Sequence, residues 1–425
     1  MEKTAIRNFD RQSFHPDTFL EEISIQVRDI CGSRKVFLLV SGGVDSTVVF
    51  ALLNKILGQE RVLGLHVDTG LMRKGESGAV LDYMRKNGFN NLRIEDATQD
   101  FLSSLEGVYD PERKREIIGN LYIDIKERVT AKLGLNADEW VLAQGTIYPD
   151  ILETAAKDSF STKGAHKVKT HHNRVDAIME LIEKGLVVEP LAPLYKDEVR
   201  KLGGHLGLPK ELVWRHPFPG PGLGVRVLCN NVFSNDVAEK DAQMLVNIAS
   251  AAGYDSCILP LRSVGVKDSQ RTYAHPAVVN GACDWDALRK LSADITKSTP
   301  SVNRVVYALN SSGTLRYQLI KAHVTSSRLD KLREVDSIVT DVLRQSGEYD
   351  SVWQMPVILL PLINDCGGEC VVLRPVISTD AITADFVPLR PETLQLIAEK
   401  TSAVEGVGDL FFDITNKPPA TIEWE

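Results

Sequence analysis

The 425-residue sequence lacks any run that approaches the roughly 20 consecutive apolar residues of a membrane-spanning helix. Residues 1–11 are polar and contain no apolar segment typical of a secretory signal peptide. Cysteine is sparse, with six residues at positions 31, 229, 257, 283, 366 and 370, none of them in a Cys-x-x-Cys pair. These absences predict a cytoplasmic protein with reduced thiols; the alternative is a metal or redox site at the cysteines.

Positive charge is also in deficit, because 49 Lys and Arg residues face 57 Asp and Glu residues, for a net charge of −8. This negative net charge excludes nucleic-acid binding through overall charge. Any site for a polyanion therefore has to be a local cluster of basic residues. The hydrophobic fraction of 43% and the charged fraction of 25% are ordinary for a globular protein. Since single cores stop growing near about 250–300 residues, the length predicts two domains.

Apolar runs alternate with helical patterns in the first half of the chain. Asp17 is expected to cap a helix that ends at Cys31. Strands are expected at residues 36–40, 62–67, 92–94 and 141–143, and a helix at 47–57. This alternation predicts an α/β fold with a doubly wound parallel sheet, in which ligands bind at the carboxyl ends of the strands. The polar segments that follow the expected strands, including Asp68 and Gly145, fall at these ends.

Residues 214–222 interrupt this pattern, because their three prolines and two glycines cannot continue a helix or a central strand. We expect a boundary near Leu228 between a domain of residues 1–228 and an α+β domain of residues 229–425. In the latter, Leu-Pro-Leu at 259–261 recurs at 360–362, and the strand at 305–310 recurs in weaker form at 410–416. We interpret this as an internal repeat with subdomains of about 229–310 and 311–425; chance similarity of short strands is the alternative.

The segment Ser-Gly-Gly-Val-Asp-Ser at 41–46 follows a buried strand and opens a helix, which predicts an anion site built from backbone N–H groups and the helix N-terminus. Two glycines allow close approach to a phosphate, and the hydroxyls of Ser41, Ser46 and Thr47 add donors. A carboxylate at Asp45 fits such a site if Mg²⁺ accompanies the phosphates. The loop lacks the lysine of a P-loop, and an ordinary glycine-containing turn is the alternative.

The loop resembles the signature of N-type ATP pyrophosphatases, a group that includes GMP, NAD, argininosuccinate and asparagine synthetases and tRNA-thiolating enzymes. Further segments resemble GMP synthetases in particular and cover nearly the whole chain. The most specific are Arg-His-Pro-Phe-Pro-Gly-Pro-Gly-Leu at 215–223 and Lys-Pro-Pro-Ala-Thr-Ile-Glu-Trp-Glu at 417–425. Others lie at residues 110–119, 144–150, 169–173, 189–191 and 196–200.

The resemblance implies that O2 of XMP attacks the α-phosphorus of ATP, and that ammonia then displaces AMP to give GMP. The residues that it implies for catalysis are Asp45, which also binds Mg²⁺, Lys169 and Lys196. Those implied for ATP binding are Ser41, Gly42, Gly43, Val44, Asp45, Ser46, Thr47, Val67 and Gly145. Those implied for XMP binding are Arg115, Gln354, Lys417, Ile422 and Glu423.

For several of these features, a purely structural role is the alternative to ligand binding. The basic cluster at 163–174 is either a cationic lid or a solvated loop, and Asp150 is either a site residue or a helix cap. Arg115 is alternatively a surface ion-pair partner. The C-terminal segment is alternatively a strand edge tucked onto the core.

The chain also departs from the family pattern. Ser269 stands where the family usually has an aspartate, beside Asp268. No cysteine has the setting of a glutaminase nucleophile, so ammonia is expected from solution, from a separate glutaminase subunit or from a domain absent here. The chain resembles the branch with an enlarged C-terminal domain. From the internal repeat we expect a monomer with an internal pseudo-dimer; a homodimer is the alternative. A tRNA-thiolating enzyme and a non-catalytic nucleotide-binding scaffold are the rival functions.

Overall fold

The computed structural model describes residues 14–150, 184–231, 237–267, 270–310, 315–365, 367–379 and 382–425. The chain forms two compact units. Unit 1 comprises Met1–Gly70, Gly75–Thr98 and Leu121–Arg215, and unit 2 comprises Leu71–Lys74, Gln99–Asn120 and His216–Glu425. The boundary predicted near Leu228 therefore lies inside unit 2. No helix within the described ranges is long and apolar enough to cross a membrane.

Unit 1 is built on a five-stranded parallel sheet with the order β3-β2-β1-β4-β5. The strands are β1 (Lys35–Leu39), β2 (Val62–Asp68), β3 (Leu92–Asp96), β4 (Trp140–Ala143) and β5 (Val187–Val188). The chain runs outward from β1 to β3 and then returns to β4 on the other side of β1. The expected doubly wound sheet is confirmed, and its switch point lies between β1 and β4, where such folds bind ligands.

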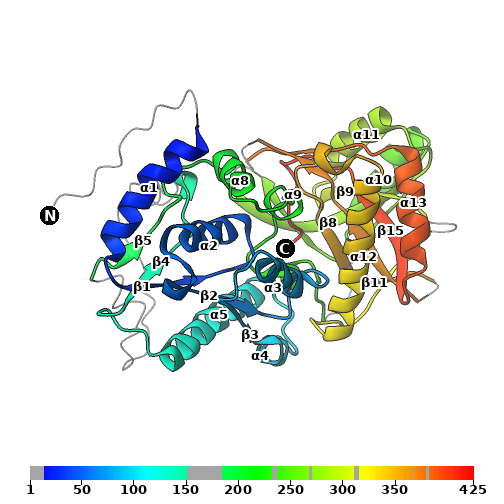
Figure 1. Ribbon diagram of the computed structural model, residues 1–425. Helices are drawn as coiled ribbons and strands as arrows, with labels where there is room; N and C mark the ends of the chain where they lie inside the picture. The colour runs from blue at the N-terminus through cyan, green and yellow to red at the C-terminus, as the bar shows by residue number, and fades with distance from the viewer. Residues whose placement is uncertain are drawn as a thin grey trace. The chain divides into compact units, whose positions relative to one another are not determined.

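Helices cover both faces of this sheet. Figure 1 shows α1, α2 and α8 on one side and α5 on the other. The helices and short turns of this part of the chain are α1 (Pro16–Cys31), α2 (Val44–Leu57), η1 (Gln59–Arg61), α3 (Glu76–Lys86), α4 (Thr98–Ser104), α5 (Pro111–Leu133), α8 (Lys196–His205) and α9 (Lys210–Val213). Helix α2 is buried along almost its whole length, which explains its continuous apolar pattern.

The capping role predicted for Asp17 is wrong. Helix α1 already begins at Pro16, with His15 as the residue before it and no side-chain cap from the described residues. Proline suits the first helical position because its fixed φ angle matches the helix and its missing N–H would be unpaired there anyway. Asp17 instead lies in the first turn, where it is 3.0 Å from Nε2 of His205.

Unit 2 contains an eight-stranded mixed sheet with the order β10-β11-β12-β15-β9-β8-β6, and β7 pairs with β8. In chain order the strands are β6 (Asp255–Ile258), β7 (Ser263–Lys267), β8 (Gln270–Asn280), β9 (Val302–Ala308), β10 (Gln318–Leu319), β11 (Val357–Ile363), β12 (Glu369–Leu373) and β15 (Val407–Asp413). A separate two-stranded sheet pairs β13 (Val376–Ile377) with β14 (Asp385–Phe386).

The topology of unit 2 contains the repeat that the sequence indicates. Strands β6 and β8 are antiparallel, and β8 is parallel to β9 across helix α11 (Trp285–Ser298). Strands β11 and β12 are likewise antiparallel, and β12 is parallel to β15 across helix α13 (Pro391–Ser402). The antiparallel pair β9–β15 joins the two copies edge to edge. From the outside of the sheet to its centre, the first copy has the order β6-β8-β9 and the second copy the corresponding order β11-β12-β15.

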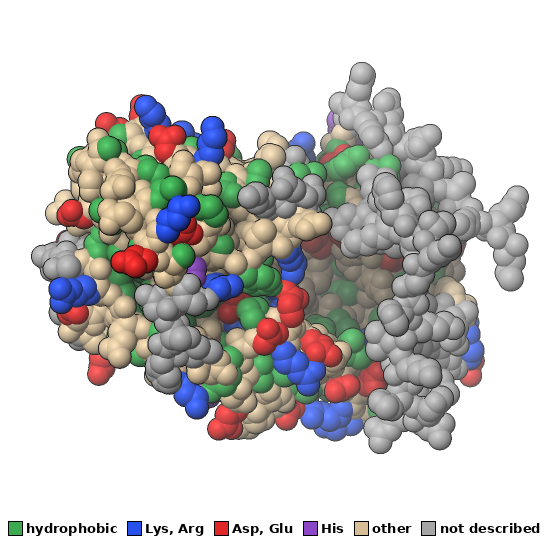
Figure 2. All heavy atoms as spheres, turned by 180° about the vertical axis from the view of Figure 1, so that it is seen from behind, with side chains coloured by type: hydrophobic (Ala, Val, Ile, Leu, Met, Phe, Trp, Pro, Cys, Tyr) green, Lys and Arg blue, Asp and Glu red, His purple; other side chains and the backbone are tan. Residues whose placement is uncertain are grey.

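Each copy is preceded by a further helix, α10 (Glu239–Ala251) or α12 (Ser326–Gln345), and the helices pack on one face of the sheet (Figure 1). On the other face, side chains from both copies form one apolar core around Trp424, including Leu259, Leu360 and Phe411. The remaining short elements are η2 (Gly222–Val225) and η3 (Tyr349–Ser351). Acidic and basic side chains are interspersed on the face drawn in Figure 2, wherever residues are described.

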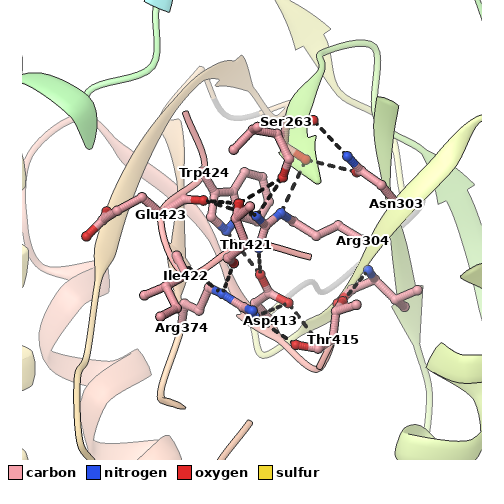
Figure 3. Close-up of polar contacts among 12 residues, drawn as sticks. Ser263, Asn303, Arg304, Arg374, Asp413, Thr415, Thr421, Ile422, Glu423 and Trp424 are labelled. Atoms are coloured by element: carbon pink, nitrogen blue, oxygen red, sulfur yellow. Dashed lines mark hydrogen bonds and ion pairs between the residues drawn. The ribbon is translucent and has the colours of Figure 1, made fainter. Parts of the chain in front are cut away.

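A buried carboxylate ties the two copies to the C-terminal segment. Asp413 on β15 lies 2.8 Å from Arg304 on β9 and 2.8 Å from Arg374, and none of the three side chains is exposed. The indole of Trp424 donates to Oδ2 of Asp413 at 3.0 Å (Figure 3). Arg304 also donates to Thr421 Oγ1, and Arg374 donates to the Thr421 carbonyl. The C-terminal segment is therefore part of the core of unit 2.

We predict that Asp413→Asn lowers the free energy of unfolding by about 3–5 kcal/mol, because two buried guanidinium groups lose the carboxylate with which both form ion pairs (Figure 3). Urea denaturation provides the measurement. The control is Asp330→Asn, which removes an exposed carboxylate from its pair with the partly exposed Arg333 and should change stability by no more than about 0.5 kcal/mol. Equal midpoints for the two variants would contradict the prediction.

Candidate active site

The loop between β1 and α2 adopts the geometry of an anion site. Gly42 has a φ of 80°, a left-handed conformation that favours glycine, and Gly43 is the residue before the helix. No side chain in the described part of the chain caps this helix. Ser41 Oγ accepts from the Gly43 N–H at 3.2 Å and lies 3.0 Å from Ser46 Oγ. The N–H groups of the first turn of α2 are thus left for a ligand.

Asp45 and Lys196 meet at this helix start although they are far apart in the sequence. Lys196 opens α8, and its Nζ lies 2.5 Å from Oδ2 of Asp45. Both side chains are partly exposed, and an exposed pair of this kind contributes only about 0–1 kcal/mol to stability. The other carboxylate oxygen of Asp45 is buried and has no hydrogen-bond partner among the described residues. The pair therefore fits a ligand site better than a purely structural role.

Gly145 lies against the same turn, and Val67 lies near the end of the neighbouring strand β2. A Cβ atom on Gly145 would lie 3.3 Å from the Ser46 nitrogen, so the segment after β4 packs directly on the first turn of α2. Val67 is buried near the carboxyl end of β2. Since β2 and β4 flank β1, the residues expected to bind ATP gather at the carboxyl ends of three neighbouring strands.

Arg215 fixes the backbone of this loop, a contact that sequence reasoning did not anticipate. Its guanidinium donates to the Gly42 carbonyl oxygen and forms a 2.5 Å ion pair with Glu76 at the start of α3. Only 12% of the Arg215 side chain and 8% of the Glu76 side chain are exposed. The segment at 215–223 thus begins with a residue that holds the glycine turn in place.

In unit 2, two of the residues expected to bind XMP are in direct contact. Gln354 Nε2 donates to Oε1 of Glu423 at 3.2 Å. Arg226 donates to both carboxylate oxygens of Glu423, from Nε at 3.1 Å and from Nη2 at 2.9 Å. Arg226 was not predicted as a site residue, because a fully buried arginine has no signal in the sequence pattern.

The last residue of the C-terminal segment is clamped by α5. The fully buried Lys114 lies 2.5 Å from the Glu425 carboxylate, and Arg115 donates to the Glu425 backbone oxygen. Burial raises the pKa of Glu425, an effect that the nearby Lys114 partly opposes. Arg115 also pairs with Glu112, which in turn contacts Arg271 at 2.7 Å. Arg115 therefore has structural contacts in this unit, and its predicted role in XMP binding stays a prediction.

Lys417 and Ile422 are held through their backbones. The N–H of Lys417 donates to the Ala384 carbonyl at 2.7 Å, and the carbonyl of Ile422 accepts from Arg374 at 3.2 Å. Both side chains are partly exposed. The predicted residue Lys169, the basic cluster at 163–174, Asp268 and Ser269 lie outside the described residues.

The described cysteines have the properties of structural thiols. Burial raises the pKa of Cys31 to about 11 and that of Cys257 to about 12, and it also raises the pKa values of Cys229, Cys283 and Cys370. Thiols with raised pKa values carry little thiolate near neutral pH. None of these five is therefore suited to act as a nucleophile. Cys366 lies outside the described residues.

Comparison with known proteins identifies related sequences. Residues 341–424 match the model of the GMP synthase C terminal domain, and residues 19–143 match the NAD synthase model. A probable glutamine-hydrolyzing GMP synthase from Leptospira interrogans is 43% identical over 96% of this chain and 67% of its own length. A glutamine-hydrolyzing GMP synthase from Dictyostelium discoideum is 34% identical over 94% of this chain and 64% of its own length.

A probable glutamine-hydrolyzing GMP synthase from Caenorhabditis elegans is 33% identical over 94% of this chain and 65% of its own length. The chain thus spans about two thirds of the length of these relatives. The similarity extends over both units, including the glycine loop and the C-terminal segment described above. On this evidence the chain belongs to the GMP synthase family.

Proposed function

We propose that this chain catalyses the ATP-dependent amination of XMP by ammonia, which yields GMP, AMP and pyrophosphate. The observation that carries the proposal is the glycine turn before α2, where an uncapped helix start meets the Asp45–Lys196 pair. This arrangement suits the binding of a nucleoside triphosphate because it combines N–H donors, a cation and a carboxylate, one oxygen of which has no partner among the described residues. A tRNA-thiolating activity is disfavoured by the raised pKa values of the described thiols.

In the proposed reaction, O2 of XMP displaces pyrophosphate from the α-phosphorus of ATP and forms adenylyl-XMP. The nitrogen of ammonia then attacks C2 of the purine, and AMP leaves with the former O2. The protein has no covalent step to perform, so its contribution is positioning and charge stabilisation. The N–H groups of the first turn of α2 bind the phosphates, and Lys196 offsets the charge of the departing pyrophosphate.

Mg²⁺ fits this site as a companion of the phosphates. Mg²⁺ commonly takes most of its ligands from phosphate and water, so the protein needs to supply only one or two carboxylates. The unpaired Oδ1 of Asp45 is the ligand that the chain itself would supply. When bound, the ion supplies charge neutralisation for the phosphates.

The proposal is tested by incubating the 425-residue chain with ATP, Mg²⁺, XMP and an ammonium salt, and by measuring AMP and GMP. We expect stoichiometric AMP and GMP with ammonium, and no GMP when glutamine replaces ammonium. The physical reason is that burial raises the pKa values of the described thiols, which makes them poor nucleophiles toward glutamine. Absence of GMP with ammonium would refute the function, and turnover with glutamine would refute the assignment of the ammonia source.

We predict that Asp45→Ala abolishes XMP-dependent release of pyrophosphate while the fold persists, because the Asp45 side chain is partly exposed and serves the phosphate site. Pyrophosphate release and thermal unfolding are measured on the same preparation. Asp17→Ala is the matched control, since it removes a carboxylate from another first helical turn and should leave release unchanged. Normal release by Asp45→Ala would exclude the metal–phosphate role.

We further propose that the functional unit is a single chain. The antiparallel pair β9–β15 already joins two copies of one topology, in the way that an isologous interface joins two subunits. The residues proposed to bind XMP, namely Arg115, Gln354, Lys417, Ile422 and Glu423, all belong to unit 2 of one chain. Sedimentation at assay dilution should therefore find an active monomer, whereas an obligate dimer that loses activity on dissociation would exclude this proposal.

A further inference from the structure

The carboxylate of Glu423 is held by an arginine, Arg226, to which the proposed function assigns no role. Arg226 contacts it through two parallel hydrogen bonds, at 3.1 Å from Nε and 2.9 Å from Nη2. The Arg226 side chain is completely buried, whereas 19% of the Glu423 side chain remains exposed. One partner is thus fixed inside unit 2, and the other reaches the surface. This is the arrangement of an oriented ligand-binding carboxylate on a rigid support.

The backbone of Arg226 is fixed on both sides. Its N–H donates to the Leu223 carbonyl at 2.9 Å, and its carbonyl accepts from the Leu359 N–H on β11 at 2.8 Å. The preceding turn depends on Gly222, which has a φ of 62° and whose added Cβ would lie 2.3 Å from the Leu71 carbonyl oxygen. The proline–glycine segment therefore fixes the guanidinium of Arg226 in contact with the carboxylate of Glu423.

The aromatic ring of Phe218 supports the guanidinium from the side. Arg226 lies over this ring at 5.2 Å and Arg73 at 4.4 Å, so the ring contacts two cations. Nη1 of Arg226 is buried and has no acceptor among the described residues. A buried donor without an acceptor lowers stability, which is a feature more typical of functional sites than of structural ion pairs.

We infer that Arg226 is a positioning residue that holds the carboxylate of Glu423 oriented toward the N–H groups of the XMP purine ring. This inference rests on the proposed function. Gln354 completes the support by donating to Oε1 of Glu423, so that among the described residues Oε2 has a single donor, Nε of Arg226. The prolines and glycines at 219–224 thus shape the turn that brings the buried guanidinium of Arg226 into contact with Glu423.

The test compares Arg226→Lys with Arg73→Lys in the complete 425-residue chain. Lysine keeps the positive charge at position 226 but cannot form two parallel hydrogen bonds to a carboxylate. We expect the KM for XMP to rise about tenfold or more in Arg226→Lys, while the KM for ATP and kcat stay within about twofold of the wild-type values. Arg73→Lys also loses an arginine contact with Phe218 but leaves the Arg226–Glu423 pair in place, so its KM for XMP should not change.

A double-mutant cycle adds a readout that a merely structural role would not produce. If Arg226 acts through Glu423, the effects of Arg226→Lys and Glu423→Gln on the KM for XMP are strongly non-additive. If Arg226→Lys does not fold, Glu423→Asp replaces it, because the shorter side chain withdraws the carboxylate from Arg226 and should raise the KM for XMP similarly.

Three results are decisive. A folded Arg226→Lys variant, or Glu423→Asp variant in its place, with an unchanged KM for XMP would overturn the inference. An equal rise of the KM values for XMP and ATP together with a lowered Tm would assign Arg226 a structural role and overturn it as well. Wild-type turnover is measured first: if the unmodified chain makes no GMP from XMP and ammonium, the proposed function itself fails, whatever the variants do.

Discussion

The carboxylate of Asp413 holds unit 2 together because three separate segments converge on it. Arg304 comes from the first copy of the repeat, Asp413 from the second, and Trp424 from the C-terminal segment. Burial lowers the pKa of Arg304 to about 10, so the guanidinium is still charged at neutral pH. A charge buried this deeply is tolerated only when it is paired and hydrogen-bonded, so the two copies cannot separate and the C-terminal segment cannot detach without exposing unpaired buried ions.

The segment at 215–226 positions two residues that act in different places. Arg215 belongs to unit 1, where it holds the Gly42 carbonyl, and Arg226 belongs to unit 2, where it holds Glu423. Between them, His216 stacks on Tyr349 with ring centroids 3.8 Å apart, and burial lowers the pKa of His216 to about 4. The histidine is therefore neutral near neutral pH and acts as a packed aromatic ring rather than as an acid or base.

Periodicity alone predicts much of this fold. The strands β1, β2 and β4 were predictable because they are buried on both faces, and the repeat was predictable because its strands carry similar apolar runs. The Asp45–Lys196 pair depends on a tertiary approach across 151 positions, which no local pattern encodes. Arg226, Arg304 and Arg374 were not recognised because arginine is usually exposed, and a sequence does not reveal which arginine is buried with a carboxylate. The start of α1 was misjudged because Pro16 already fills the first helical position, one residue before the expected cap.

The two copies in unit 2 are similar in topology but differ in what interrupts them. The first copy contains the extra strand β7, whose Val264 and Val266 donate to the Trp424 and Pro419 carbonyls. At the matching place the second copy has only residues 364–368 between β11 and β12. Its own additional strands, β13 and β14, follow β12 instead, and the adjacent Ala384 pairs with Lys417. The C-terminal segment is thus held at its start by an insertion of the second copy and at its end by one of the first. Because each insertion occurs in one copy only, the two contacts that hold the C-terminal segment come from different copies of the near-symmetric sheet.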